Sequence, residues 1–203
     1  MGQYYLSAVL KHNFGEANIQ PVECGIYPHD FGNGAKLMEF SYLRNNFVNA
    51  TMQLIALHNG RPFVMCGDYA DENFYVNELG KHRNCYEIAL DEKKIISKEK
   101  LEKLAKERNI CPNYRYIINE DKKEYLDLND YLETEKEIGS WAIHPLPLLC
   151  ADGCFRGSGD YAKSDINSDK VGYWKYDCIR VSNIPPDEKM GYEKIFIEFR
   201  EIY

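Results

Sequence analysis

A glycine-rich stretch in the last third of the chain contains residue types suited to binding an anion. Residues 153–160 read Gly-Cys-Phe-Arg-Gly-Ser-Gly-Asp. Glycines allow backbone N–H groups to converge on one point, and an arginine among them can clamp a phosphate or a carboxylate. The stretch is neither a Walker loop nor a dinucleotide fingerprint, and its composition also fits an irregular connection between strands. We expect Arg156, Gly157 and Gly159 to bind a small anionic ligand, with a purely structural loop as the alternative.

The tripeptide Gly-Asp-Tyr occurs twice, at 67–69 and at 159–161. Carboxylates that follow strands can act as general acids and bases, or bind a hard metal ion, when two such loops meet at one edge of a sheet. They are also common as turn and capping residues, which is the structural alternative. The predicted ligand-binding residues are Asp68, Tyr69, Asp71, Arg156, Gly157, Gly159, Asp160 and Tyr161.

A single histidine, His144, lies in an apolar, proline-containing segment just before the glycine-rich stretch. It can serve as a general base oriented by Asp152 or Asp160, and these three residues are the catalytic candidates. The alternative is a buried histidine that hydrogen-bonds a backbone carbonyl. His144, Cys150 and Cys154 do not complete a local set of four zinc ligands, so we predict no metal and no cofactor.

Composition narrows the class of protein. The 203 residues contain 25 Lys and Arg against 32 Asp and Glu, a net charge of −7, which argues against direct nucleic-acid binding. The longest apolar runs are shorter than the roughly 18 to 20 residues of a membrane span. Seven scattered cysteines, an odd number, fit free thiols in a reducing compartment. We therefore expect a cytoplasmic protein that does not enter the membrane. The 16 tyrosines fit either recognition loops or half-buried sheet positions.

Hydrophobic periodicity predicts the elements that position these residues. Apolar side chains at spacings of three and four predict one long helix over about 35–58, and a narrower stripe predicts a short helix over about 97–108. Two β-prone runs around a polar turn predict a hairpin over 114–128. Further strands are expected at 3–10, 62–66, 141–149, 173–181 and 192–203, with an acidic helical turn or linker at 129–140. The prediction is one α+β domain over 1–203, with a mostly antiparallel sheet.

Several stretches along nearly the whole chain resemble an uncharacterised family of small proteins from bacteria and their phages. The stretches are MGQYY at 1–5, KLME at 36–39, NNFV at 45–48, GDYAD at 67–71, YIIN at 116–119, KEYLDL at 123–128, IHPLPLL at 143–149 and GSGDY at 157–161. The resemblance implies no particular activity. It implies a phage or mobile-element setting and an accessory or counter-defence role.

Two function classes remain open from the sequence. The first is a small acidic binding module that engages a protein partner or sequesters a small, phosphorylated ligand. The second is a small hydrolase or nucleotide-processing enzyme with its site around His144 and the 153–160 loop. Convergence of His144, Arg156 and Asp160 on one concave pocket with Asp68 would favour the enzyme or a ligand-binding site.

Overall fold

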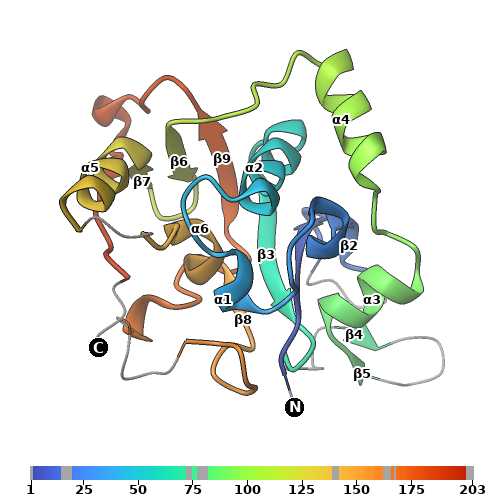
Figure 1. The fold of residues 1–203 in the computed structure, drawn as a ribbon. Coiled ribbons are helices and arrows are strands. Elements are labelled where there is room, and N and C mark those ends of the chain that lie inside the picture. Colours follow the sequence, from blue (N-terminus) through green and yellow to red (C-terminus); the bar gives the residue numbers. More distant parts are fainter. Residues whose placement is uncertain are drawn as a thin grey trace.

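The computed structural model describes residues 2–14, 20–71, 75–76, 82–138, 142–161, 166 and 168–199. These residues form an α+β fold with a mostly antiparallel eight-stranded sheet in the order β10-β7-β6-β9-β3-β1-β2, with β8 paired to β3 (Figure 1). The strands are β1 (Tyr5–Leu10), β2 (Val22–Ile26), β3 (Arg61–Gly67), β6 (Tyr116–Asn119), β7 (Glu124–Asp127), β8 (Ala151–Asp152), β9 (Cys178–Ser182) and β10 (Glu193–Lys194). A separate hairpin pairs β4 (Tyr75–Val76) with β5 (His82–Arg83).

Six α-helices pack around this sheet in the described part of the chain. They are α1 (Leu37–Phe40), α2 (Asn46–Leu57), α3 (Cys85–Asp91), α4 (Lys98–Glu107), α5 (Leu128–Ile138) and α6 (Pro145–Leu149). Three short 3-10 turns, η1 (Pro28–Phe31), η2 (Ser168–Lys170) and η3 (Glu188–Met190), complete the regular structure. In the same residues no helix is both long enough and apolar enough to cross a membrane.

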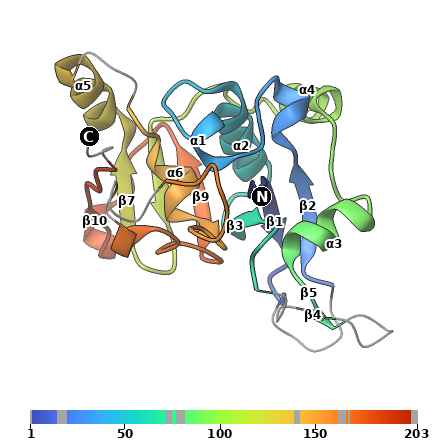
Figure 2. The ribbon, with the colours of Figure 1, turned by 60° about the horizontal axis from the view of Figure 1, so that its bottom comes forward.

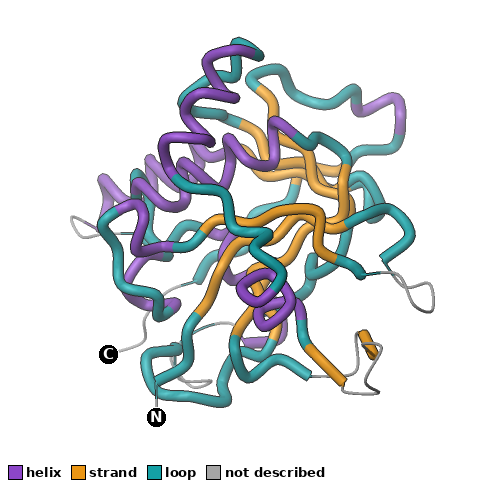
Figure 3. The backbone as a smooth tube through the Cα atoms, turned by 90° about the vertical axis from the view of Figure 1, so that its right-hand side faces the viewer, coloured by secondary structure: helices purple, strands orange, loops and turns teal. Residues whose placement is uncertain are grey.

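The centre of the sheet is built on β1 and β3, which are antiparallel neighbours. All six residues of β1 are buried because helices cover both faces of this part of the sheet. Alternate side chains of β1 point to opposite faces: Tyr5 and Val9 join the core under α2, whereas Leu6 and Ala8 join a second cluster with α3. Figure 3 shows these strands as a strongly twisted sheet, and Figure 2 shows α2 and α3 over different parts of it.

The prediction of one long helix over 35–58 is not confirmed, because the structure divides this segment into α1 and α2. The first helix, α1, ends at Ser41, whose ψ of 57° is not helical, and the φ of 62° at Arg44 is also incompatible with a continuing helix. Asn45 then caps α2, with its Oδ1 accepting hydrogen bonds from the backbone N–H groups of Phe47 (2.8 Å) and Val48 (3.3 Å). The apolar spacing continues across the break because both helices face the same core.

Four predicted elements are confirmed. The strands expected at 3–10 and 62–66 are β1 and β3. The short helix expected over 97–108 is α4, capped by Ser97, whose hydroxyl accepts from the backbone N–H of Lys100 at 3.4 Å. The expected hairpin is β6 and β7, which pair antiparallel with Ile117 opposite Leu126. The acidic segment that follows forms α5 rather than a linker.

The last third of the chain contains fewer strands than predicted. The segment 141–149, expected to be a strand, instead forms α6 over its second half, with Pro145 at the first helical position where a missing N–H costs nothing. The strand expected at 173–181 begins only at Cys178, as β9 (Cys178–Ser182), and the strand expected at 192–203 is limited in the described residues to β10 (Glu193–Lys194). Residues 200–203 lie outside the described part of the chain.

Candidate functional site

The glycine-rich loop packs closely against the chain just before β1. The side-chain amide of Gln3 donates to the Gly153 carbonyl at 2.6 Å, and the Gln3 backbone N–H donates to the Ser158 carbonyl at 3.0 Å. A Cβ atom on Gly157 would lie only 2.6 Å from the Gln3 Cβ, so this position requires glycine. Close packing of the loop therefore accounts for part of its glycine content.

The loop also contacts the chain of the first Gly-Asp-Tyr segment and the residues just after it. The Arg156 guanidinium holds the Asp71 carboxylate through two hydrogen bonds, of 2.6 Å and 3.0 Å, and Nη1 also donates to the Tyr69 carbonyl at 2.9 Å. Hydrogen bonding to this guanidinium lowers the pKa of Asp71. Arg156 and Asp71 are exposed to solvent, so an anion would compete with the Asp71 carboxylate for the guanidinium.

Asp160, at the end of the loop, turns its carboxylate inward. Its Oδ2 accepts from the Phe155 backbone N–H at 2.9 Å, while Oδ1 is buried without a hydrogen bond to the described residues. Burial raises the pKa of Asp160 to about 6. Burial also raises the pKa of the neighbouring Cys154 thiol to about 12, so this thiol is not an activated nucleophile.

The remaining predicted residues of this region contact other parts of the fold. Asp68 accepts from the Tyr4 backbone N–H at 3.0 Å. The Tyr161 hydroxyl lies 2.8 Å from the Ser41 hydroxyl. Asp152 accepts from Lys175 Nζ at 3.0 Å and from the Tyr176 hydroxyl. Within the described chain, no three His, Cys, Asp or Glu side chains are grouped to hold a metal ion.

His144 has different surroundings from Asp152 and Asp160. It caps α6, with Nδ1 accepting from the Leu146 backbone N–H at 3.2 Å, so the ring proton belongs on Nε2. The side chain is 2% exposed, and Nε2 has no partner among the described residues. Burial lowers the pKa of His144 to about 3, so the imidazole is a neutral hydrogen-bond donor at physiological pH.

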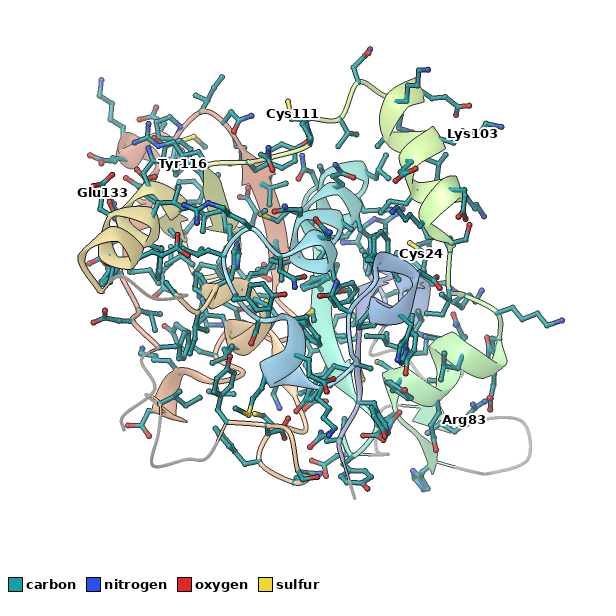
Figure 4. The ribbon with its side chains drawn as sticks, in the orientation of Figure 1. Cys24, Arg83, Lys103, Cys111, Tyr116 and Glu133 are labelled. Atoms are coloured by element: carbon teal, nitrogen blue, oxygen red, sulfur yellow. The ribbon has the colours of Figure 1, made fainter. Side chains whose placement is uncertain are left out.

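His144 lines a pocket of about 550 Å³, within the size range of small-molecule sites. Its lining residues come from α2, from the start of α5 and from the chain between Cys111 and Tyr116, which are both labelled in Figure 4. It is lined by Leu43, Arg44, Asn49, Met52, Asn113, Tyr114, Arg115, Leu128, Asn129, Leu132, His144 and Asn183. The lining combines apolar side chains with amide and guanidinium groups.

Both arginines of the pocket already hold carboxylates. Arg115 binds Asp127 through Nε–Oδ1 and Nη2–Oδ2 hydrogen bonds of 2.9 Å and 2.7 Å. Arg44 pairs with Glu135 of α5. The positive charge at the pocket is therefore neutralised by the protein itself.

Of the predicted site residues, only His144 lines this pocket. The structure brings Tyr69, Asp71 and Arg156 together at the glycine-rich loop, away from the pocket lining. The pocket was missed because its lining comes from several segments far apart in the sequence. The one local signal was His144 followed directly by Pro145. This order is that of an N-cap residue and the first residue of a helix, as found at the start of α6.

Comparison of the chain with the models of known protein families, with curated proteins and with solved structures finds no match in any of the three.

Proposed function

We propose that this protein is a binding module and that the pocket between α2 and α5 holds a small organic ligand. The observation that carries the proposal is the pocket itself, whose volume of about 550 Å³ lies within the range of small-molecule sites. A ligand of this size can cover the apolar side chains of the lining and hydrogen-bond to its amide groups.

The shape and lining of the pocket support the same function. Leu43, Met52, Leu128 and Leu132 offer apolar contacts, and the polar groups lie around them. Sites for small molecules have this combination of an apolar surface and a few convergent polar groups.

Three observations favour binding over catalysis. The neutral imidazole of His144 takes up a proton only near pH 3, far below the range of a useful general base. Asp152 is engaged by Lys175 and Tyr176, and Asp160 by the Phe155 backbone N–H. Neither carboxylate lines the pocket with His144. The hydrolase or nucleotide-processing alternative stays a prediction.

The other expectations from the sequence also stay predictions. They are engagement of a protein partner or a phosphorylated ligand by the glycine-rich loop, location in the cytoplasm, and an accessory or counter-defence role in a phage. The last of these rests on the family resemblance alone.

The proposal is tested by NMR of the protein labelled with [¹³C-methyl]methionine. Met52 lies in the pocket, whereas Met65 lies in the core and Met38 is exposed. We expect addition of millimolar toluene, benzamide, benzoate or phenyl phosphate, one probe at a time, to shift the Met52 methyl signal with at least one probe. The Met65 and Met38 signals serve as internal references.

A matched pair of variants locates the binding. Asn49→Trp places an indole in the pocket from α2, whereas Asn46→Trp places the same side chain on an exposed position of the same helix. Probe-dependent shifts should persist in Asn46→Trp and disappear in Asn49→Trp. If no probe moves Met52 in the wild type, or if the shifts survive in Asn49→Trp, the proposed pocket does not bind ligands of this size.

A further inference from the structure

A group of buried polar side chains lies beneath the glycine-rich loop, at the start of β1. Three of its oxygen atoms, Gln3 Oε1, the Tyr5 hydroxyl and Asp160 Oδ1, are buried without a hydrogen-bond partner among the described residues. A Cβ atom on Gly67 would lie 2.3 Å from Gln3 Nε2 and 3.1 Å from Tyr5 Cε1, so both side chains pack over this point of β3. Buried polar atoms are almost always paired, which sets this group apart from the rest of the core.

No positive charge is paired with the Asp160 carboxyl in the described part of the chain. Arg156, the nearest arginine in the sequence, binds Asp71 instead. Lys36 packs the methylenes of its side chain against the loop, because a Cβ atom on Gly159 would lie 2.3 Å from Lys36 Cδ. Among the described residues, however, Lys36 makes no ion pair with Asp160.

The other ionisable neighbours of Asp160 also fail to compensate a negative charge. The Cys154 thiol and the Tyr5 hydroxyl stay protonated at neutral pH, because burial raises the pKa of both groups. The Asp68 carboxylate adds a like charge, which raises the pKa of Asp160. The nearby Tyr5 hydroxyl and the backbone N–H groups of Phe155 and Arg156 lower this pKa, but burial outweighs them.

The closed position of the loop is what keeps the Asp160 carboxyl away from water. Gln3 holds both ends of the loop, since its side-chain amide donates to the Gly153 carbonyl and its backbone N–H donates to the Ser158 carbonyl. An ionised carboxylate with one oxygen buried and unpaired is unfavourable, and it can be hydrated when the loop moves away from Gln3.

We propose that Asp160 is a proton-dependent latch of the glycine-rich loop. When protonated, it allows residues 153–160 to stay closed over Gln3 and Tyr5; when ionised, it favours an open loop in which the carboxylate is hydrated. The latch would control access to the Gln3 amide, the Tyr5 hydroxyl and the Cys154 thiol. It lies outside the lining of the pocket, so it does not depend on the proposed function.

The pKa of Asp160 sets the direction and the size of the effect. In the closed loop burial raises this pKa to about 6, whereas a hydrated aspartate has a pKa of about 3.9. The closed loop therefore binds the proton more tightly than the open loop. Closure is favoured fully below about pH 4, and this preference is lost as the pH rises through about 6. The ratio of open to closed loops should rise by about 100-fold in total, and about tenfold of this rise falls between pH 5 and pH 7.5.

Hydrogen exchange of individual backbone amides measures the opening of the loop. The Gln3 N–H donates to the Ser158 carbonyl and the Phe155 N–H donates to Asp160, so both are exposed when the loop opens. Protection factors, which are corrected for the intrinsic pH dependence of exchange, should fall by about tenfold for these two amides between pH 5 and pH 7.5. The Met65 N–H, which donates to the Cys150 carbonyl at 2.9 Å in the core, is the internal reference.

Two conservative variants test whether Asp160 is the group responsible. Asp160→Asn keeps an acceptor for the Phe155 N–H but cannot ionise, so the protection factors of Gln3 and Phe155 should be the same at both pH values. Asp68→Asn keeps an acceptor for the Tyr4 N–H and removes the like charge that raises the pKa of Asp160. In this variant the fall in protection should be smaller than in the wild type.

Each other result would overturn the latch. Equal protection of Gln3 and Phe155 at pH 5 and pH 7.5 in the wild type would show that ionisation does not open the loop. A fall that persists in Asp160→Asn would assign the effect to another group. An equal fall at Met65 would mean that the whole fold opens rather than the loop. None of these results bears on ligand binding in the pocket.

Discussion

The Arg115 guanidinium holds the Asp127 carboxylate across the β6–β7 hairpin, with Nε 2.9 Å from Oδ1 and Nη2 2.7 Å from Oδ2. Asp127 also accepts from the Asn129 backbone N–H at 3.1 Å, so the same carboxylate links the hairpin to the first turn of α5. The pair thereby fixes one wall of the pocket and removes an otherwise available positive charge from it.

Removal of Arg115 should destabilise the protein because the nearly buried Asp127 carboxylate would keep only the more distant Lys194 ammonium, 3.9 Å away, as a cationic partner among the described residues. Burial raises the pKa of Asp127, but the hydrogen bonds from Arg115 and from the Asn129 N–H outweigh this effect. The pKa of Asp127 therefore lies below its ordinary value. Arg115→Ala should lower the free energy of unfolding, by less than the loss of a fully buried pair would, because the guanidinium is half-exposed. Urea unfolding at pH 7 measures the change.

The double variant Arg115→Ala/Asp127→Asn is the control for this effect. Removal of the carboxylate charge should restore part of the stability lost in Arg115→Ala. Equal instability of the single and double variants would show that lost packing, rather than a stranded charge, is responsible.

Asp160 should make the protein less stable as the pH rises. Its native pKa, raised to about 6 by burial, exceeds the value of about 3.9 for an unfolded aspartate, so the native state binds the additional proton between these values. The contribution of Asp160 to stability is complete below about pH 4 and is lost as the pH rises through about 6. Asp160→Asn keeps an acceptor for the Phe155 N–H and should stabilise the protein more at pH 7.5 than at pH 5. An equal effect at both pH values in urea unfolding would refute the raised pKa.

Asn45 should stabilise the start of α2 after the break between the two helices, because its buried side chain caps the first turn of α2. Its Nδ2 also donates to Asn33 Oδ1 at 2.7 Å. Asn45→Ala should cost about 1 to 2 kcal/mol in the free energy of unfolding. Asn46→Ala, at the exposed next position, should change it by less than about 0.5 kcal/mol. Similar effects of the two substitutions would mean that the side-chain cap contributes little.

Phe47 should be the most sensitive position on the core face of α2. Its ring is fully buried, with ring centroids 4.9 Å from Phe40 and 6.0 Å from Phe31. Phe47→Ala should lower the free energy of unfolding by about 3 to 5 kcal/mol. Met38→Ala, at an exposed apolar position, is the matched control and should have little effect. An unchanged melting temperature in Phe47→Ala would contradict the packing described for this helix.

Local rules predicted the elements whose signals lie within a few residues of one another. The polar turn between two β-prone runs predicted β6 and β7, and Ser97 before a narrow apolar stripe predicted α4. The division of the long helix was harder to foresee. Its apolar spacing runs through the break, where the non-helical backbone of Ser41 ends α1 and the side chain of Asn45 caps the start of α2.

The amino-acid sequence by itself determined the α+β class, the core face of α2 and the chemistry available at each position. Only the tertiary structure decided which of those groups meet. It set Arg156 against Asp71 at the glycine-rich loop, and it brought His144 into a pocket with residues from α2 and α5. The physical reason is that hydrophobic periodicity and caps act within single elements. A pocket depends on the order and packing of strands far apart in the chain, and no local spacing encodes that arrangement.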